Sequence, residues 1–99
     1  MNTSAPAAKK WHVVSKGYFY ECGESTVIYF DRASGDTHLI SDFAAYLVQR
    51  LDRESKPLDT TEIVELIRHE IETDNLQELS STLPGILQEL NNLDIVAPT

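Results

Sequence analysis

The spacing of apolar residues changes once along this chain, from a period of two residues to a period of 3.6, and the change falls between Ile40 and Ser41. Before it, β-branched and aromatic clusters are separated by turn residues, which is typical of short antiparallel strands. After it, the pattern is typical of amphipathic helices. A chain of 99 residues with this order is expected to form one α+β domain, with strands first and helices after them.

Three strands are predicted in the first part, over residues 10–15, 26–30 and 37–40. The segment 18–24 is interrupted by Gly23 and follows Gly17, so we expect a partly packed loop there. Residues 31–36 are rich in turn formers, and the second and third strands should therefore form a hairpin. The third strand then lies at the edge of the sheet with one side open, unless another segment covers it.

The first two helices are predicted from their capping residues. Ser41 is a good N-cap, and the helix that it begins should run to about Leu51. Asp59 or Thr60 should cap the second helix, which carries an apolar stripe and should end near Thr73.

A third helix is expected after Ser81, with Pro84 in its first turn, where a missing N–H does no harm. Its apolar residues follow helical spacing: Leu83, Ile86, Leu87, Leu90 and Leu93. Most such stripes are core, but the flank formed by Leu83, Leu87 and Leu90 could instead line a groove beside the open third strand. Periodicity leaves both interpretations open. The expected arrangement is βββααα, a three-stranded antiparallel sheet followed by three helices, as in winged-helix folds.

The distribution of charge argues against nucleic acid as a partner. The chain has 16 acidic and 8 basic side chains, a formal net charge of −8, and no Lys or Arg follows Arg68. A third helix without cations would repel phosphate instead of releasing its counterions.

No apolar run is long enough to cross a membrane, and residues 1–9 have the composition of a disordered leader rather than a signal peptide. The domain is therefore expected over residues 10–99, without a membrane partner and in the cytoplasm.

Residues that could support catalysis are few. His12, His38 and His69 have no metal-ligand spacing, and Cys22 has no second cysteine to pair with. Glycines are isolated, and none begins a phosphate-binding loop. We therefore expect no catalytic residue, no metal and no cofactor.

Two parts of the sequence resemble a known family. They are the stretch VIYFDRASGDTHLI at residues 27–40 with the following SDFAAYLVQRL, and the closing ELNNLDIV at residues 89–96; Trp11 adds to the likeness. Together they resemble the PqqD family of peptide chaperones, most closely the branch of the HPr-rel-A system, which is encoded with a protein related to HPr kinase. The likeness covers about residues 10–96, although a glycine is common in the family where this chain has Asp94.

The resemblance implies a RiPP recognition element, a winged-helix domain that holds the leader of a ribosomally made precursor peptide for a modifying enzyme. In similar proteins the leader pairs with the third strand and packs on the third helix. That implies backbone pairing at Asp36, Thr37, His38 and Leu39 and an apolar wall of Leu83, Leu87 and Leu90. Catalysis would belong to the partner, either the modifying enzyme or the HPr-kinase-like protein.

Three alternatives stay open at this point. A winged-helix fold could bind nucleic acid, although the charge distribution opposes it. The chain could be a structural adaptor for the kinase-like partner without holding a peptide. An open edge strand could also pair with a second copy of itself and give a homodimer.

Overall fold

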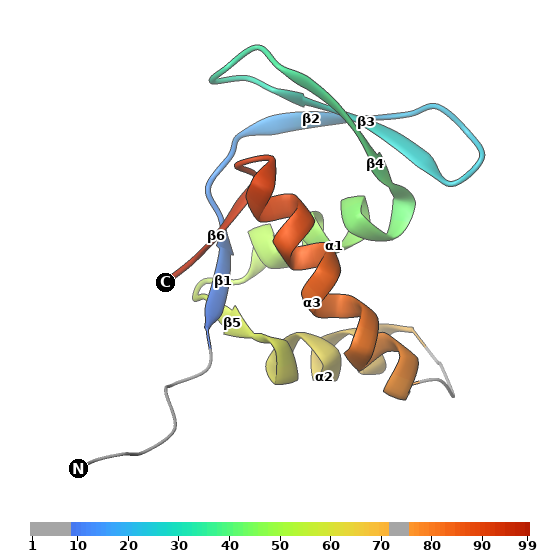
Figure 1. Ribbon diagram of the computed structural model, residues 1–99, viewed down its shortest axis with the longest axis vertical. Helices are drawn as coiled ribbons and strands as arrows, with labels where there is room; N and C mark the ends of the chain where they lie inside the picture. The colour runs from blue at the N-terminus through green and yellow to red at the C-terminus, as the bar shows by residue number, and fades with distance from the viewer. Residues whose placement is uncertain (1–8, 72–75) are drawn as a thin grey trace.

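The computed structural model describes residues 9–71 and 76–99, and within them it is an α+β fold with three helices and six strands in two sheets (Figure 1). The elements follow the order β1 (Lys10–Val13), β2 (Gly17–Glu21), β3 (Thr26–Asp31), β4 (Thr37–Ser41), α1 (Asp42–Arg53), β5 (Leu58–Asp59), α2 (Thr60–Glu70), α3 (Leu76–Asn92) and β6 (Val96–Pro98). The predicted α+β class is confirmed. The predicted single sheet is wrong, because the strands form two.

The larger sheet has the order β2-β3-β4 and is antiparallel throughout. It forms the upper layer in Figure 1, above the helices. The predicted hairpin between β3 and β4 is confirmed, with Gly35 at φ 78° in the turn. The open side predicted for the strand at 37–40 is also present, because β4 pairs with β3 alone among the residues that the structure describes.

The prediction of a loop over residues 18–24 is wrong, because residues 17–21 form β2. Gly17 is the first residue of the strand and Gly23 lies in the turn after it, so neither interrupts the strand. Gly17 lies so close to β3 that an added Cβ would be 2.4 Å from the Phe30 carbonyl oxygen and 2.4 Å from the Tyr29 ring. Glycine is therefore needed here for close approach of two strands, not for a chain break.

The smaller sheet has the order β5-β1-β6 and runs along one side of the helices, below the larger sheet (Figure 1). The strand predicted at 10–15 exists over residues 10–13, but its partners come from the second half of the chain. α3 leads into β6 through Asp94, whose φ of 61° is a left-handed conformation that often ends a helix. The amide of Ile95 then donates to the Leu90 carbonyl at 3.0 Å.

The helix starts show which capping predictions hold. The Ser41 hydroxyl accepts a hydrogen bond from the Ala44 amide at 3.0 Å, as expected of an N-cap. Asp59, rather than Thr60, caps α2, and it forms a reciprocal capping box with Glu62. α2 ends at Glu70, whereas the predicted end at Thr73 lies outside the described residues.

α3 is longer than predicted, because it begins at Leu76 instead of following Ser81. Pro84 is therefore in the interior of the helix and not in its first turn. An interior proline removes one backbone hydrogen bond, and tertiary packing has to offset that loss. Leu83 and Leu87, one residue before and three after Pro84, are completely buried and supply such packing.

One core joins the two sheets and the three helices. Its most buried large side chains include Tyr29 of β3, Leu47 of α1, Ile63 of α2 and Val96 of β6. Within the described residues, no helix is both long enough and apolar enough to cross a bilayer.

Candidate functional site

The open edge of β4 contains the residues predicted to pair with a peptide backbone, and the strand register shows which of their backbone groups are free. In an antiparallel pair, the backbone groups of successive residues point alternately toward the partner strand and away from it. The Asp31 amide donates to the Asp36 carbonyl at 2.8 Å, and the Asp42 amide donates to the Ser25 carbonyl at 2.9 Å. These two bonds, at either end of the register, fix which residues of β4 face β3.

It follows that His38 and Ile40, opposite Tyr29 and Val27, direct their backbone groups to β3. The N–H and C=O of Thr37 and Leu39 point to the open side of the sheet. Of the four residues predicted for backbone pairing, the register therefore leaves Thr37 and Leu39 free to pair. Asp36 and His38 have their backbone groups engaged with β3 or directed toward it.

The side chains of this sheet separate into an inner and an outer face. Val27, Tyr29 and Ile40 point inward to the helices and are buried. The outer face carries two rows of cross-strand neighbours: Tyr20, Ile28 and Leu39 in one, and Tyr18, Phe30 and Thr37 in the other. Each row crosses β2, β3 and β4 and ends at the open edge.

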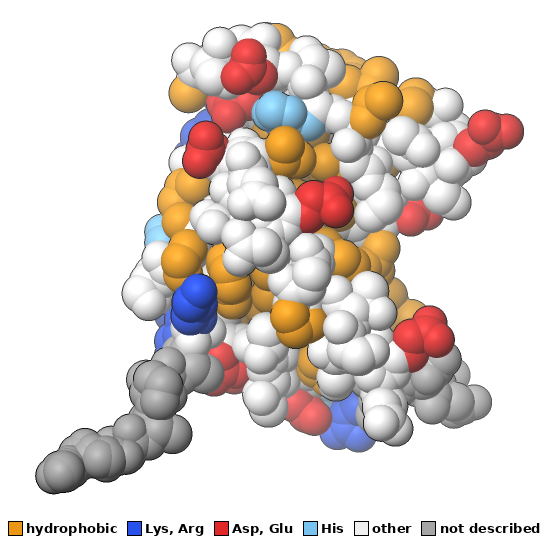
Figure 2. Space-filling model, viewed as in Figure 1, with side chains coloured by type: hydrophobic (Ala, Val, Ile, Leu, Met, Phe, Trp, Pro, Cys, Tyr) orange, Lys and Arg blue, Asp and Glu red, His pale blue; other side chains and the backbone are white. Residues whose placement is uncertain are grey.

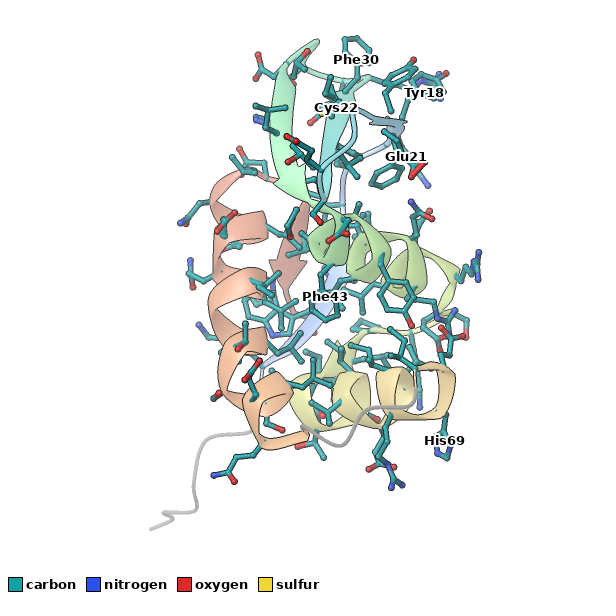
Figure 3. The ribbon with its side chains drawn as sticks, turned by 90° about the vertical axis from the view of Figure 1, so that its right-hand side faces the viewer. Tyr18, Glu21, Cys22, Phe30, Phe43 and His69 are labelled. Atoms are coloured by element: carbon teal, nitrogen blue, oxygen red, sulfur yellow. The ribbon has the colours of Figure 1, made fainter. Side chains whose placement is uncertain are left out.

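The outer face is unusually apolar for a surface exposed to water. Leu39 is 69% exposed, Tyr20 56% and Tyr18 49%. Apolar side chains lie along the top of the molecule, over this sheet (Figure 2). Tyr18 and Phe30 lie together on the side turned away from the helices, with ring centroids 6.5 Å apart (Figure 3). A contiguous exposed patch of this kind marks an interaction surface more often than scattered apolar residues do.

Acidic residues stand at both ends of the β4 edge. Asp36 precedes the strand and Asp42 follows it, and both are exposed. The turn before β4 is ordered by Asp31, whose carboxylate accepts hydrogen bonds from the Ala33 and Ser34 amides at 2.9 and 3.4 Å. Burial alone would raise the pKa of Asp31, but these hydrogen bonds outweigh it and lower the pKa. The edge is thus a short open strand between two negative charges.

The predicted apolar wall of α3 is not open in this structure. Leu83, Leu87 and Leu90 are 0, 0 and 1% exposed and belong to the core. Phe43, half-buried at the start of α1, lies in the space between α1 and α3 below the sheet (Figure 3). The three leucines therefore have the core role of the two interpretations that periodicity left open, and they do not contact solvent beside β4.

The candidate reactive side chains are not brought together. Cys22 is exposed near the β2–β3 turn, whereas His69 lies at the opposite end of the molecule, on α2 (Figure 3). Among the residues that the structure describes, no group of three metal-ligating side chains gathers.

The candidate contact residues that sequence reasoning missed are the outer-face residues of β2 and β3. Their signal was present, because Tyr18, Tyr20, Ile28 and Phe30 are all at even-numbered positions of two adjacent segments. It was hidden because the first segment was interpreted as a loop.

Comparison of the chain with protein-family models, with curated proteins and with solved structures finds no match.

Proposed function

We propose that this chain is a non-catalytic peptide chaperone of the PqqD type. In this proposal its β2–β4 sheet and three helices form a winged-helix-like domain. It binds the leader of a ribosomally synthesised precursor peptide by strand addition at β4 and presents it to a modifying enzyme, or to an HPr-kinase-like protein.

The observation that carries the proposal is the unpaired edge of β4 beside an apolar outer face. Thr37 and Leu39 each offer one N–H and one C=O to an added strand. A net contribution of about 0.5–1.5 kcal/mol for each hydrogen bond would orient a peptide but would select its sequence only weakly. Selection must therefore come from side chains.

The two outer-face rows supply that selection. A strand added beside β4 would place alternate side chains on the outer face, where each extends a row by one member. The residues opposite Leu39 and Thr37 would pack best if they were aromatic or aliphatic. Asp36 and Asp42 would favour Lys or Arg near the ends of the bound segment and disfavour acidic residues there.

The proposed peptide contacts differ at α3 from those that the PqqD resemblance implies. Since Leu83, Leu87 and Leu90 are buried, the apolar contact is assigned to the outer face of the sheet instead of to α3. A leader could still reach the leucines if α3 moved outward. The two modes predict different amide shifts, on the sheet in one case and along α3 in the other.

The test is an NMR titration with the synthetic leader of a precursor encoded beside this gene. We expect the amides of Thr37 and Leu39 to shift and to become protected from hydrogen exchange. Thr37→Pro removes one outward N–H at the first residue of an edge strand, where proline is tolerated. It should weaken binding roughly two- to tenfold, the loss expected for one hydrogen bond.

The matched control is Thr37→Val, which keeps the amide and the shape of the side chain and should bind normally. No amide shift anywhere in residues 36–40 would refute the proposal. Co-purification with the kinase-like protein without any leader binding would favour the adaptor instead.

A further inference from the structure

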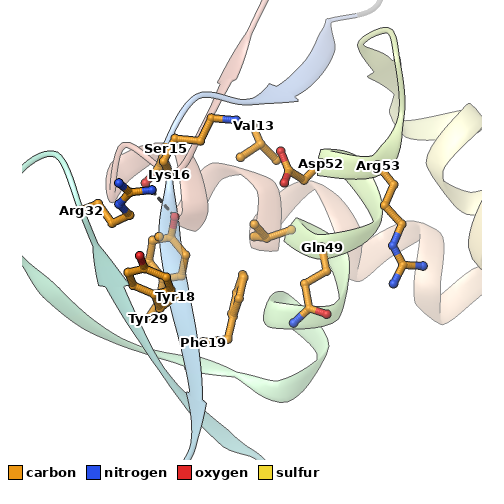
Figure 4. Close-up of a pocket in the computed structure, with 12 residues that line it drawn as sticks. Val13, Ser15, Lys16, Tyr18, Phe19, Tyr29, Arg32, Gln49, Asp52 and Arg53 are labelled. Carbon is orange, nitrogen blue, oxygen red and sulfur yellow. Dashed lines mark hydrogen bonds between the residues drawn. The ribbon is translucent and has the colours of Figure 1, made fainter.

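A cavity of about 300 Å³ lies on the side of the sheet opposite β4, between β2, the connection that precedes it and α1 (Figure 4). Its inner wall is formed by Phe19, Tyr29 and Val48, and its rim by Lys16, Arg32, Gln49, Asp52 and Arg53. This volume is at the lower end of the range of small-molecule sites. The cavity lies away from the β4 edge, and Tyr18, which also belongs to the outer face, is the one outer-row residue that lines it.

The rim is positively charged in a strongly acidic protein. Three of the chain's 8 Lys and Arg residues, Lys16, Arg32 and Arg53, line this one cavity. Within the described part of the chain none of the three forms a salt bridge, whereas Arg50 pairs with Glu70 at 2.9 Å and Arg68 with Glu65 at 3.1 Å. With 16 acidic residues available, unpaired cations at one opening are a charge arrangement suited to an anion.

The positions of the cations differ. Arg32 lies over the Tyr18 ring, with its guanidinium carbon 5.6 Å from the ring centroid, and this contact limits its motion. Lys16 comes from the chain between β1 and β2 and its side chain extends toward Val13 and Asp52, while Arg53 stands on α1 with its guanidinium turned outward (Figure 4). Lys16 and Arg32 are therefore the principal cations, and Asp52 is the one carboxylate at the rim that opposes them.

Two hydroxyl groups lie inside the cavity, in a wall that is otherwise apolar. The Ser15 hydroxyl and the Tyr29 hydroxyl are 2.7 Å apart and buried. Burial raises the pKa of the Tyr29 phenol, so both groups are neutral hydroxyls at physiological pH. Phe19 packs against Tyr29 with ring centroids 5.0 Å apart, which leaves an aromatic surface beside the hydroxyl pair.

We propose that this cavity binds a small organic anion, with a carboxylate or phosphate held by Lys16 and Arg32 and an aromatic or aliphatic body against Phe19 and Val48. The proposal does not depend on peptide binding at β4. It assigns a ligand-binding site to the β2 side of the sheet, where the fold otherwise leaves an open space between a strand and a helix.

The test uses four probes in NMR titrations of the whole chain: benzoate, phenyl phosphate, inorganic phosphate and benzylamine. Benzoate or phenyl phosphate should cause saturable shifts of the Tyr18 and Phe19 resonances, and benzylamine should not. The better of the two aromatic anions identifies the acid group. Inorganic phosphate should bind more weakly than phenyl phosphate, because it lacks the body that would contact the inner wall.

Three exposed substitutions separate this site from nonspecific attraction. Arg32→Gln should weaken binding of the aromatic anion by roughly two- to fivefold, and Asp52→Asn should strengthen it by a similar factor, as expected for exposed charges. Lys56→Gln removes an exposed cation outside the cavity lining and should change little. Equal binding of benzylamine and benzoate, an equal loss in Arg32→Gln and Lys56→Gln, or no saturable shift with any anion would overturn the proposal.

Discussion

Replacing Leu87 and Leu39 separately by alanine distinguishes a core leucine from a surface leucine at the candidate site. Leu87 is 0% exposed and sits in α3, while Leu39 is 69% exposed at the β4 edge. Truncating a completely buried leucine loses its transfer free energy and leaves a cavity, which together cost about 2–5 kcal/mol. Only about a third of the Leu39 surface is covered, so its truncation should cost less than about 1 kcal/mol.

Urea unfolding followed by far-UV circular dichroism measures this difference. With a denaturant slope of about 2 kcal/mol/M for a small domain, Leu87→Ala should lower the unfolding midpoint by roughly 1–2.5 M. Leu39→Ala should lower it by less than about 0.5 M. Both variants should keep the slope of the parent chain if the fold is unchanged.

The two substitutions should affect the affinity for the leader peptide in the opposite order. Leu39→Ala removes the last member of an outer-face row and should weaken binding, while Leu87→Ala should leave the affinity of the folded fraction unchanged. If Leu87→Ala instead weakened binding while its unfolding midpoint stayed near that of the parent, the leucines of α3 would line the binding groove. The assignment of peptide contacts to the outer face would then be wrong.

Three further predictions follow from single contacts. Tyr29→Phe leaves the buried Ser15 hydroxyl without its 2.7 Å partner and should cost about 1–3 kcal/mol in unfolding free energy, measured by urea titration. Because the pKa of Asp31 is lowered in the folded state, its contribution to stability is present above the ordinary value of 3.8 and is lost as pH falls through the folded pKa. Unfolding midpoints measured between pH 6 and pH 3 should therefore decline less steeply in Asp31→Asn, and equal slopes would contradict this. Sedimentation velocity should show more dimer in the double variant of Asp36→Asn and Asp42→Asn than in the parent at low salt, and less difference at high salt.

Local signals in the sequence predicted the elements that have clear end markers. Ser41 and Asp59 cap their helices because a hydroxyl or carboxylate at that position satisfies a free amide, whatever the tertiary context. The turn at residues 31–36 formed as expected because Gly35 allows the positive φ that it requires. These features depend on a few neighbouring residues, which is why sequence alone was enough.

Features that depend on distant parts of the chain were not predictable in this way. β1 pairs with β5 and β6, which are two and three residues long and carry no periodicity of their own. β2 has aromatic residues on both faces, so the alternation that marks a half-buried strand is absent. Whether the α3 leucines face a groove or the core depends on what packs against them, and helical spacing is the same in both cases.

An open edge with an apolar flank should also attract a second copy of the chain, and the two acidic residues at its ends explain how this can be limited. When two β4 strands pair antiparallel over their full length, Leu39 of one copy lies opposite Leu39 of the other. That register brings Asp36 of each copy opposite Asp42 of its partner, so two like-charge pairs oppose the dimer. A peptide with basic or neutral residues at those positions would not meet this repulsion. The same two carboxylates would therefore disfavour self-pairing and favour such a peptide, and no change in the fold is needed for that selection.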